Sequence, residues 1–304
     1  MNHPAELALT SLIRRLENGD VTISDDTKEQ VYKEVKVALD REFSGADRAK
    51  RGFTLRMSNI GRPYCQLWFQ KNKPEAAREP ESGFAIKMMI GDIVEAAFKG
   101  FLKEAGVEYT DTKKVVWTTS SGKEIVGHYD LEMNGAVDDV KSASPYAFDR
   151  KFESFETLAA DDSFGYVAQL AAYARGSGLK VGGWWVINKT TGQFKYTPAD
   201  GMDVDAVLAD IEAKIAELDA NEFRRCFEPV EETFRSKLTG NTKLSSSCGF
   251  CDFKESCWDI IRAPETNSTA RNPKEVEYIY IAPENMVTNS GAIIIKEFHE
   301  IKTT

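Results

Sequence analysis

The apolar residues of the first hundred positions recur with the spacing of amphipathic helices. One such pattern covers residues 5–43, and the polar break at Asn18-Gly19-Asp20 divides it into two helices. The same spacing predicts helices over residues 62–70 and 84–105. The chain therefore begins with a helical region.

Beyond residue 107 the pattern changes to the two-residue alternation of β-strands, with Asn134-Gly135 as a tight hairpin turn. The elements predicted after this change are strands 115–117, 125–131 and 136–141, helix 164–176, strands 181–188 and 193–197, helix 203–222, and closing strands 278–281 and 292–295.

This order predicts an α/β fold, with a central mixed β-sheet flanked by helices. Four segments are expected along the chain. They are a helical N-terminal region (1–61), a core (62–200), a helix followed by a cysteine-rich segment (201–263), and a polar linker with a C-terminal strand pair (264–304).

The composition of the 304 residues is that of a globular protein that can bury a core. No apolar run is long enough to span a membrane, and the N-terminus lacks the pattern of a signal peptide. We therefore expect an intracellular, cytoplasmic protein, in which five cysteines point to metal ligation rather than to a disulfide scaffold.

The net charge of −9 argues mildly against a protein that coats nucleic acid. One local stretch departs from this balance, because it has five basic residues and no acid. It is a candidate DNA-contacting strip, and a solvated basic surface is the equal alternative. Its residues are Arg48, Lys50, Arg51, Arg56 and Arg62.

The hairpin at residues 125–141 carries candidate chemistry. Asp139 and Lys141 lie two residues apart on one strand, so their side chains share a side, together with Asp130 on the partner strand. Two carboxylates with an ammonium beside them can bind a divalent ion and orient a water molecule, as phosphodiester hydrolysis requires. His128 is expected on the side of Asp130, and Asp138 on the opposite face. A polar hairpin that faces solvent is the alternative.

Two predicted helices add residues to this set. Glu95 follows Gly91-Asp92 on the helix upstream of the hairpin, and Gln169 and Tyr173 lie one turn apart on the helix downstream. The alternative for Gln169 and Tyr173 is a helix face that packs on the sheet.

This order of motifs resembles the RecB-like branch of the PD-(D/E)xK nuclease superfamily, over about residues 62–188. The resemblance implies a restriction-endonuclease-like core. It implies that Glu95, Asp130 and Asp139, with the backbone carbonyl of Val140, bind Mg²⁺ or Mn²⁺. Catalytic roles are implied for these acids and for the residues Lys141, Gln169 and Tyr173.

The cysteines extend the resemblance. Cys248-x2-Cys251-x5-Cys257, with Cys65 far upstream, is similar to the iron–sulfur RecB-like exonucleases of the CRISPR-adaptation and AddB type. The compact size of the chain would suit a stand-alone phage or CRISPR-associated enzyme. The resemblance implies that these four thiols bind a [4Fe-4S] cluster, with zinc as the alternative and three metal-free buried cysteines as a third. Cys226 has no place in this pattern.

The resulting prediction is a metal-dependent DNA exonuclease that hydrolyses phosphodiester bonds from single-stranded ends during recombination or repair. A partner-dependent DNA-end subunit of a recombination or CRISPR-adaptation complex is the alternative, and an iron–sulfur redox protein is the third. The chain has no nucleotide-binding Gly-x4-Gly-Lys loop, so a helicase would be a separate partner. The oligomeric state stays open.

Overall fold

The computed structural model describes residues 3–43, 52–79, 83–264 and 275–279. The chain divides into two compact units, one made of residues 1–62 and 80–220 and the other of residues 63–79 and 221–304. The predicted α/β class is confirmed, with a central mixed sheet, flanking helices and a helical N-terminal region. The predicted linker at 267–274 and strand at 292–295 lie outside the described residues.

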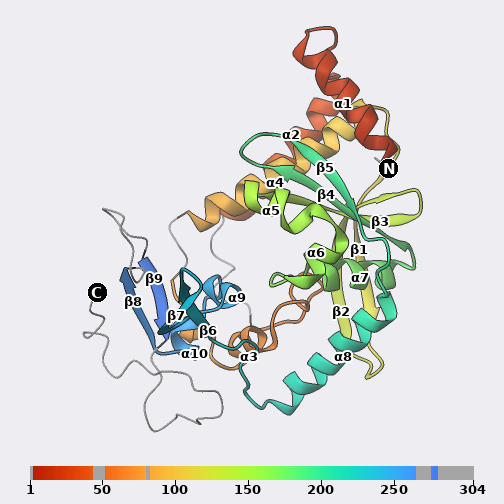
Figure 1. The fold of residues 1–304 in the computed structure, drawn as a ribbon. Helices are drawn as coiled ribbons and strands as arrows, with labels where there is room; N and C mark the ends of the chain where they lie inside the picture. The colour runs from red at the N-terminus through yellow and green to blue at the C-terminus, as the bar shows by residue number, and fades with distance from the viewer. Residues whose placement is uncertain (1–2, 44–51, 80–82, 265–274, 280–304) are drawn as a thin grey trace. The chain divides into compact units, whose positions relative to one another are not determined.

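The first unit contains a five-stranded sheet in the order β1-β2-β3-β4-β5 (Figure 1). Strands β3 and β4 are parallel and the other neighbours are antiparallel, so the sheet is mixed as predicted. The strands are β1 (Thr110–Thr118), β2 (Glu124–Met133), β3 (Ala136–Ala143), β4 (Lys180–Asn188) and β5 (Phe194–Pro198).

Helices cover both faces of this sheet (Figure 1). Helices α7 (Tyr166–Ser177) and α8 (Val204–Ala220) enclose the larger apolar core on one face. On the other face, α1 (Pro4–Glu17) and α4 (Phe84–Glu104) pack around Trp185. Helix α2 (Asp25–Phe43) lies along α4, and the β3–β4 crossover adds the short helices α5 (Pro145–Asp149), η2 (Lys151–Glu153) and α6 (Phe155–Ala160).

The predicted turn at Asn134-Gly135 is confirmed by positive φ angles of 52° and 74° at the two residues. β2 pairs with β3 only next to this turn, where Leu131–Met133 lie opposite Ala136–Asp138. The two strands then separate, while β3 continues its pairing with β4 through Ala143. The gap between β2 and β3 leaves room for the side chain of Asp130.

The start of α7 is held by the loop that precedes it. The carboxylate of Asp162 accepts the backbone N–H groups of Gly165, Tyr166 and Val167 at 2.8–2.9 Å, which satisfies donors that a helix start leaves unpaired. Gly165 has a φ of +81°, and a Cβ at Gly61 would lie 2.4 Å from the Cα of Gly165. Both glycines are therefore required for this close approach.

The second unit contains an antiparallel sheet in the order β6-β7-β9-β8 and helices from both ends of its sequence (Figure 1). The turn between β6 and β7 uses Arg235 and Ser236 at positive φ, without a glycine, and gives no hairpin signal in the sequence. Its elements are α3 (Tyr64–Asn72), η1 (Pro74–Ala76), β6 (Val230–Phe234), β7 (Lys237–Lys243), α9 (Ser246–Gly249), α10 (Lys254–Cys257), β8 (Ile260–Pro264) and β9 (Glu275–Ile279).

None of the helices in the described ranges combines the length and the apolar character that crossing a membrane would require.

Asp138 turns its side chain away from that of Asp139, as the alternation predicts. Its Oδ1 accepts hydrogen bonds from the phenol of Tyr196 and the N–H of Gly183, both at 2.8 Å. The residue is 1% exposed, and this burial raises the pKa of its carboxyl to about 7. The protonated acid is therefore the favoured form in the folded protein below about pH 7.

Because the folded-state pKa of Asp138 lies above its unfolded value, its ionisation destabilises the fold. The stability of the wild type relative to Asp138→Asn is expected to fall as the pH rises from about 4 to about 7, and to stay constant above that. The total change should be on the order of a few kcal/mol. Urea unfolding of both proteins across this pH range measures it, and a difference that does not vary with pH would contradict the assignment.

Candidate active site and cysteine cluster

Asp130 on β2 and Asp139 on β3 are brought together where the two strands separate. The Oδ2 atom of Asp130 accepts a hydrogen bond from the backbone N–H of Val140 at 2.7 Å. If β2 and β3 stayed paired, this N–H would instead donate to a backbone carbonyl of β2. The observed bond holds Asp130 beside the peptide that follows Asp139. Burial and the nearby carboxylate of Asp139 raise the pKa of Asp130.

Asp139 is buried without the hydrogen bonds that a carboxylate normally receives. The residue is 1% exposed, and neither Oδ1 nor Oδ2 accepts a hydrogen bond of good geometry. The ammonium of Lys141 lies 2.5 Å from Oδ2 as an ion pair. One cation therefore compensates two neighbouring acids, so the site retains capacity for further positive charge.

Lys141 is held in its charged form. Burial by itself lowers the pKa of the ammonium, but the carboxylates of Asp139 and Asp130 outweigh burial and raise it. The ammonium also lies 5.1 Å above the ring of Tyr166, the first residue of α7. At neutral pH Lys141 can donate hydrogen bonds but cannot accept a proton.

Glu95 reaches the same site from α4. Burial, followed by the charge of Asp130, raises the pKa of its carboxyl to about 7. Its Oε1 pairs with the ammonium of Lys99 at 2.7 Å, and Lys99 also binds Asp111 at 2.9 Å and Thr112 at 2.8 Å. The predicted acid on the upstream helix thus lies close to Asp130 of the hairpin.

Lys99 is a residue of this site that the sequence pattern did not identify. It is 2% exposed, and it ties Glu95 on α4 to Asp111 on β1. Although burial lowers the pKa of Lys99, its two carboxylate partners raise it overall. The four-residue spacing of Glu95 and Lys99 is the signal that could have indicated the pair, because such residues lie on one helix face.

Gln169 and Tyr173 form the predicted pair on α7. The amide Nε2 of Gln169 donates to the phenol oxygen of Tyr173 at 2.7 Å. Burial and then the carboxylates of Asp139 and Asp130 raise the pKa of Tyr173. The phenol therefore lies beside the acids, and its ring packs on Gly127 of β2, where a Cβ would lie 2.7 Å from it. The residue serves both packing and the site.

A groove of about 680 Å³ opens beside these residues in the first unit. Glu95 and Asp130 lie on its wall, and so does His128, on the side of Asp130 as predicted. Helix α2 contributes the opposite wall with Lys33 and Arg41. The candidate site is therefore accessible from solvent.

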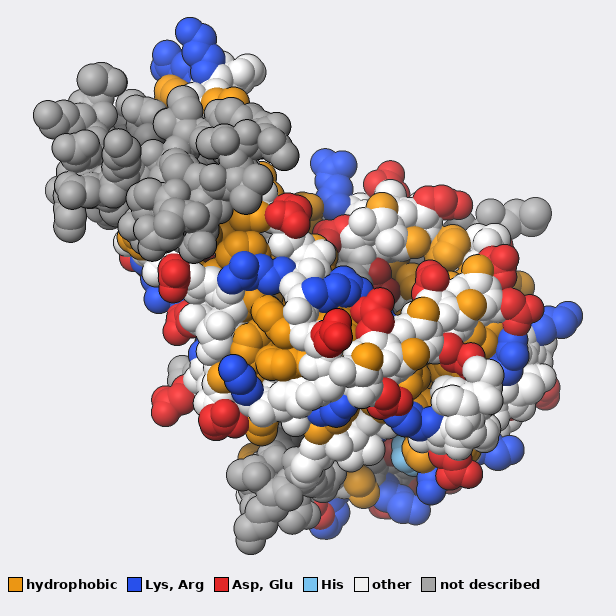
Figure 2. Space-filling model, turned by 90° about the horizontal axis from the view of Figure 1, so that it is seen from below, with side chains coloured by type: hydrophobic (Ala, Val, Ile, Leu, Met, Phe, Trp, Pro, Cys, Tyr) orange, Lys and Arg blue, Asp and Glu red, His pale blue; other side chains and the backbone are white. Residues whose placement is uncertain are grey.

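The predicted basic strip is described only in part. Arg48, Lys50 and Arg51 lie outside the described residues, Arg56 is exposed and Arg62 is partly buried. Figure 2 shows basic side chains scattered among acidic ones on the face that it presents. The strip as a DNA-contacting surface stays a prediction.

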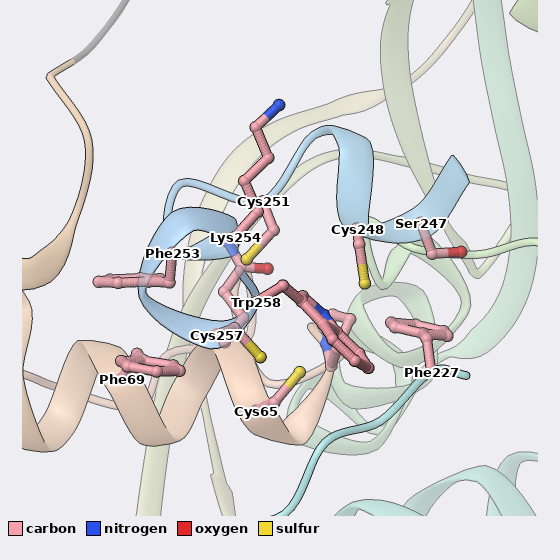
Figure 3. Close-up of a pocket in the computed structure, with 12 residues that line it drawn as sticks. Cys65, Phe69, Phe227, Ser247, Cys248, Cys251, Phe253, Lys254, Cys257 and Trp258 are labelled. Atoms are coloured by element: carbon pink, nitrogen blue, oxygen red, sulfur yellow. The ribbon is translucent and has the colours of Figure 1, made fainter. Parts of the chain in front are cut away.

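Four cysteines of the second unit surround a cavity of about 20 Å³ (Figure 3). Cys65 reaches it from α3, and Cys248, Cys251 and Cys257 reach it from the segment of α9 and α10. The residues predicted as one ligand set therefore converge, although about 180 positions separate the two segments. The rest of the lining is largely apolar and includes Phe69, Phe227, Phe253 and Trp258.

Hydrogen bonds hold the cysteine segment in place independently of any metal. The hydroxyl of Ser256 donates to the carbonyl of Ala76 at 3.0 Å, which joins α10 to η1. The guanidinium of Arg225 donates to the carbonyl of Cys257 and stacks 4.1 Å over Trp258. The buried ammonium of Lys254 bonds the carbonyl of Gly249 at 3.2 Å.

Cys226 lies next to this group, which the spacing of the cysteines in the sequence did not indicate. Its Sγ accepts the backbone N–H of Cys65 at 3.0 Å. A hydrogen bond between the two thiols, and then burial, raise the pKa of Cys65. Burial raises the pKa of Cys251 to about 11. These thiols are protonated at neutral pH unless a metal ion displaces the protons.

Within the described residues, no group of three or more His, Cys, Asp or Glu side chains is arranged as a finished metal site. The donor chemistry nevertheless fits two kinds of ion. The carboxylate oxygens of Asp139, which accept no hydrogen bond of good geometry, suit a hard cation such as Mg²⁺ or Mn²⁺ together with Asp130 and Glu95. The thiols around the apolar cavity suit zinc or iron.

No family model matches this chain, and no curated protein gives a significant match. Among solved structures, the chain is similar to one titled "Crystal structure of SSO0001", with a TM-score of 0.41 and 13% sequence identity. The match covers 78% of this chain and 98% of that chain. A likeness at this level carries no argument, so the interpretation of the site rests on its own geometry.

Removal of the Lys141 ammonium should expose the cost of burying Asp139. Lys141→Met is expected to lower the free energy of unfolding by about 3–5 kcal/mol, because it leaves a buried carboxylate unpaired. The double variant Asp139→Asn/Lys141→Met should recover much of that loss. Urea denaturation of the two single variants and the double variant measures the coupling.

Lys123→Met is the matched control, since it removes an exposed ion pair with Asp219. It should change stability by no more than about 1 kcal/mol. Equal effects of Lys141→Met and Lys123→Met would contradict a buried, coupled ion pair at the site.

Proposed function

We propose that the first unit is a metal-dependent nuclease that hydrolyses phosphodiester bonds of DNA from single-stranded ends. The observation that carries the proposal is Asp139, a buried carboxylate without hydrogen bonds, beside Asp130 and Lys141. Asp139 is buried and Asp130 is partly buried beside the same ammonium. This arrangement suits a site that binds a cation and an anionic substrate together.

Glu95, Asp130 and Asp139 would hold the ion, together with the carbonyl of Val140. A divalent ion in this place supplies Lewis-acid stabilisation of charge on the phosphate and lowers the pKa of a bound water. The carboxyl of Glu95 must be ionised to bind a cation, and its pKa of about 7 makes that contribution sensitive to pH near neutrality. Lys99 counteracts the burial that favours the protonated acid.

Lys141 has the role of a donor in this proposal. Since its ammonium stays charged, it can hydrogen-bond a phosphate oxygen or orient the attacking water, and it cannot act as the general base. Its position above the ring of Tyr166 limits its side-chain motion. The ammonium is thereby directed toward Asp139 and the reacting group.

Gln169 and Tyr173 support the acids from α7. Because the phenol oxygen of Tyr173 already accepts the amide of Gln169, its own proton is available to a carboxylate or a phosphate oxygen. Unwinding of duplex DNA would come from a separate helicase, and the proposed reaction would take place in the cytoplasm.

The test is degradation of end-labelled single-stranded DNA with Mg²⁺ or Mn²⁺. Wild-type protein should degrade the labelled DNA, and EDTA should abolish this activity because it removes the metal ion. Asp139→Asn should reduce the rate at least about 100-fold, because it removes a metal ligand. DNA with blocked ends and circular single-stranded DNA serve as further substrates. An exonuclease should leave both intact, whereas an endonuclease should cut both.

Asp138→Asn is the matched control, since Asp138 is the adjacent residue on the same strand and faces away. It should retain activity close to that of the wild type. Unchanged activity in Asp139→Asn, or equal losses in both variants, would overturn the assignment of this site.

We further propose that Cys65, Cys248, Cys251 and Cys257 bind a metal centre that joins the two segments of the second unit. The resemblance favours a [4Fe-4S] cluster, whereas the volume of about 20 Å³ fits a single zinc ion without expansion of the cavity. In either form the centre is structural, because four thiolates saturate it. Its stabilising effect comes from closing a loop of about 180 residues.

Cys251→Ala should lose the bound metal and unfold at a lower temperature than wild type. Iron and zinc per chain, visible absorbance and the melting temperature of anaerobically purified protein measure this outcome. Ser247→Ala, at another residue that lines the cavity, should retain the metal. A metal-free wild-type protein, or full metal content in Cys251→Ala, would contradict the centre.

A further inference from the structure

The second unit gathers five thiols, although a four-coordinate centre needs four. Cys226 lies in the segment between α8 and β6, and its Sγ accepts the backbone N–H of Cys65 at 3.0 Å. The Cys226 side chain, and then burial, raise the pKa of the Cys65 thiol, which agrees with this contact. Cys226 is thus a direct neighbour of a proposed ligand.

The charges of the thiols show that Cys226 is near the rest of the group as well. Cys226 and Cys248 both affect the ionisation of Cys257, and Cys251 affects that of Cys65. Such effects require short separations in a poorly screened interior. These influences agree with the geometry, in which Cys226 touches Cys65 and its neighbour Arg225 bonds the carbonyl of Cys257.

The segment that carries Cys226 is anchored on both sides of this residue. The phenol of Tyr64, the first residue of α3, donates to the carbonyl of Glu222. The guanidinium of Arg225 bonds the carbonyl of Cys257 at 2.7 Å. These contacts hold Cys226 against the start of α3 and against the end of α10, which are the two elements that the proposed metal centre joins.

We propose that Cys65 and Cys226 are interchangeable ligands for one coordination position of the thiolate centre, and this inference rests on the centre proposed above. Either sulfur completes the set formed by Cys248, Cys251 and Cys257. The thiol that does not bind the metal remains beside it as a reserve ligand. Exchange would break the bond from the metal to one sulfur and form a bond to the other, while the proton of the incoming thiol passes to the released thiolate, so no oxidant or reductant is needed.

This arrangement should let the coordination position shared by Cys65 and Cys226 tolerate the loss of one cysteine, which the other three positions should not. Cys251 lines the cavity together with Cys65, Cys248 and Cys257, and each of these three thiols is already a proposed ligand. Loss of Cys251 also leaves four thiols, but Cys65 and Cys226 share one coordination position, so only three positions can be filled. Loss of Cys65 or Cys226 leaves one sulfur for each of the four positions.

The experiment compares metal content in full-length Cys65→Ser, Cys226→Ser, the double variant Cys65→Ser/Cys226→Ser, and Cys251→Ala, all purified anaerobically. Iron and zinc per chain and the visible spectrum are the measurements, so no nuclease assay is involved. Each single variant at position 65 or 226 should retain metal close to the wild-type level. The double variant should lose nearly all of it, as Cys251→Ala does.

Loss of metal or of folded protein in both Cys65→Ser and Cys65→Ala, with Cys226 intact, would overturn the exchange. Retention of metal in the double variant would overturn it too, because another group would then hold the position. A wild-type protein without metal would instead refute the centre itself. If the wild type binds metal while Cys65→Ser and Cys65→Ala do not, only the exchange between Cys65 and Cys226 is refuted.

Discussion

The separation of β2 from β3 just beyond their turn is the constraint on which the candidate active site depends. A continuous ladder would bond the N–H of Val140 to a backbone carbonyl, whereas here the side chain of Asp130 accepts it at 2.7 Å. This exchange brings a second carboxylate beside Asp139 within the sheet. The charge of Lys141 then becomes necessary, because two buried acids repel each other in a medium of low dielectric constant.

Helix α7 adds to this arrangement from the larger core. Its start is held by Asp162 and by the close approach of two glycines, which places Tyr166 under the ammonium of Lys141. Two turns further, Tyr173 lies among the same acids while its ring packs on Gly127. One helix therefore supplies both packing for the sheet and polar groups for the site, which ties the geometry of the site to the stability of the unit.

The second unit follows a different principle, since apolar packing around a small cavity holds thiols together. Aromatic rings surround the cysteines, and hydrogen bonds to Ala76 and Cys257 position the segments that carry them. The fold thus brings the thiols near one another before any metal is bound. This preorganisation reduces the entropy that binding would otherwise cost.

Periodicity and turn chemistry in the sequence determined the order of the elements in the first unit, the Asn134-Gly135 turn and the opposite directions of Asp138 and Asp139. These features depend on neighbours in the chain. Only the tertiary structure decided that Lys99 binds Asp111, that Asp130 fills the gap between strands, and that Cys226 joins Cys65. Contacts between residues far apart in sequence depend on how whole elements pack, and local spacing carries no record of them.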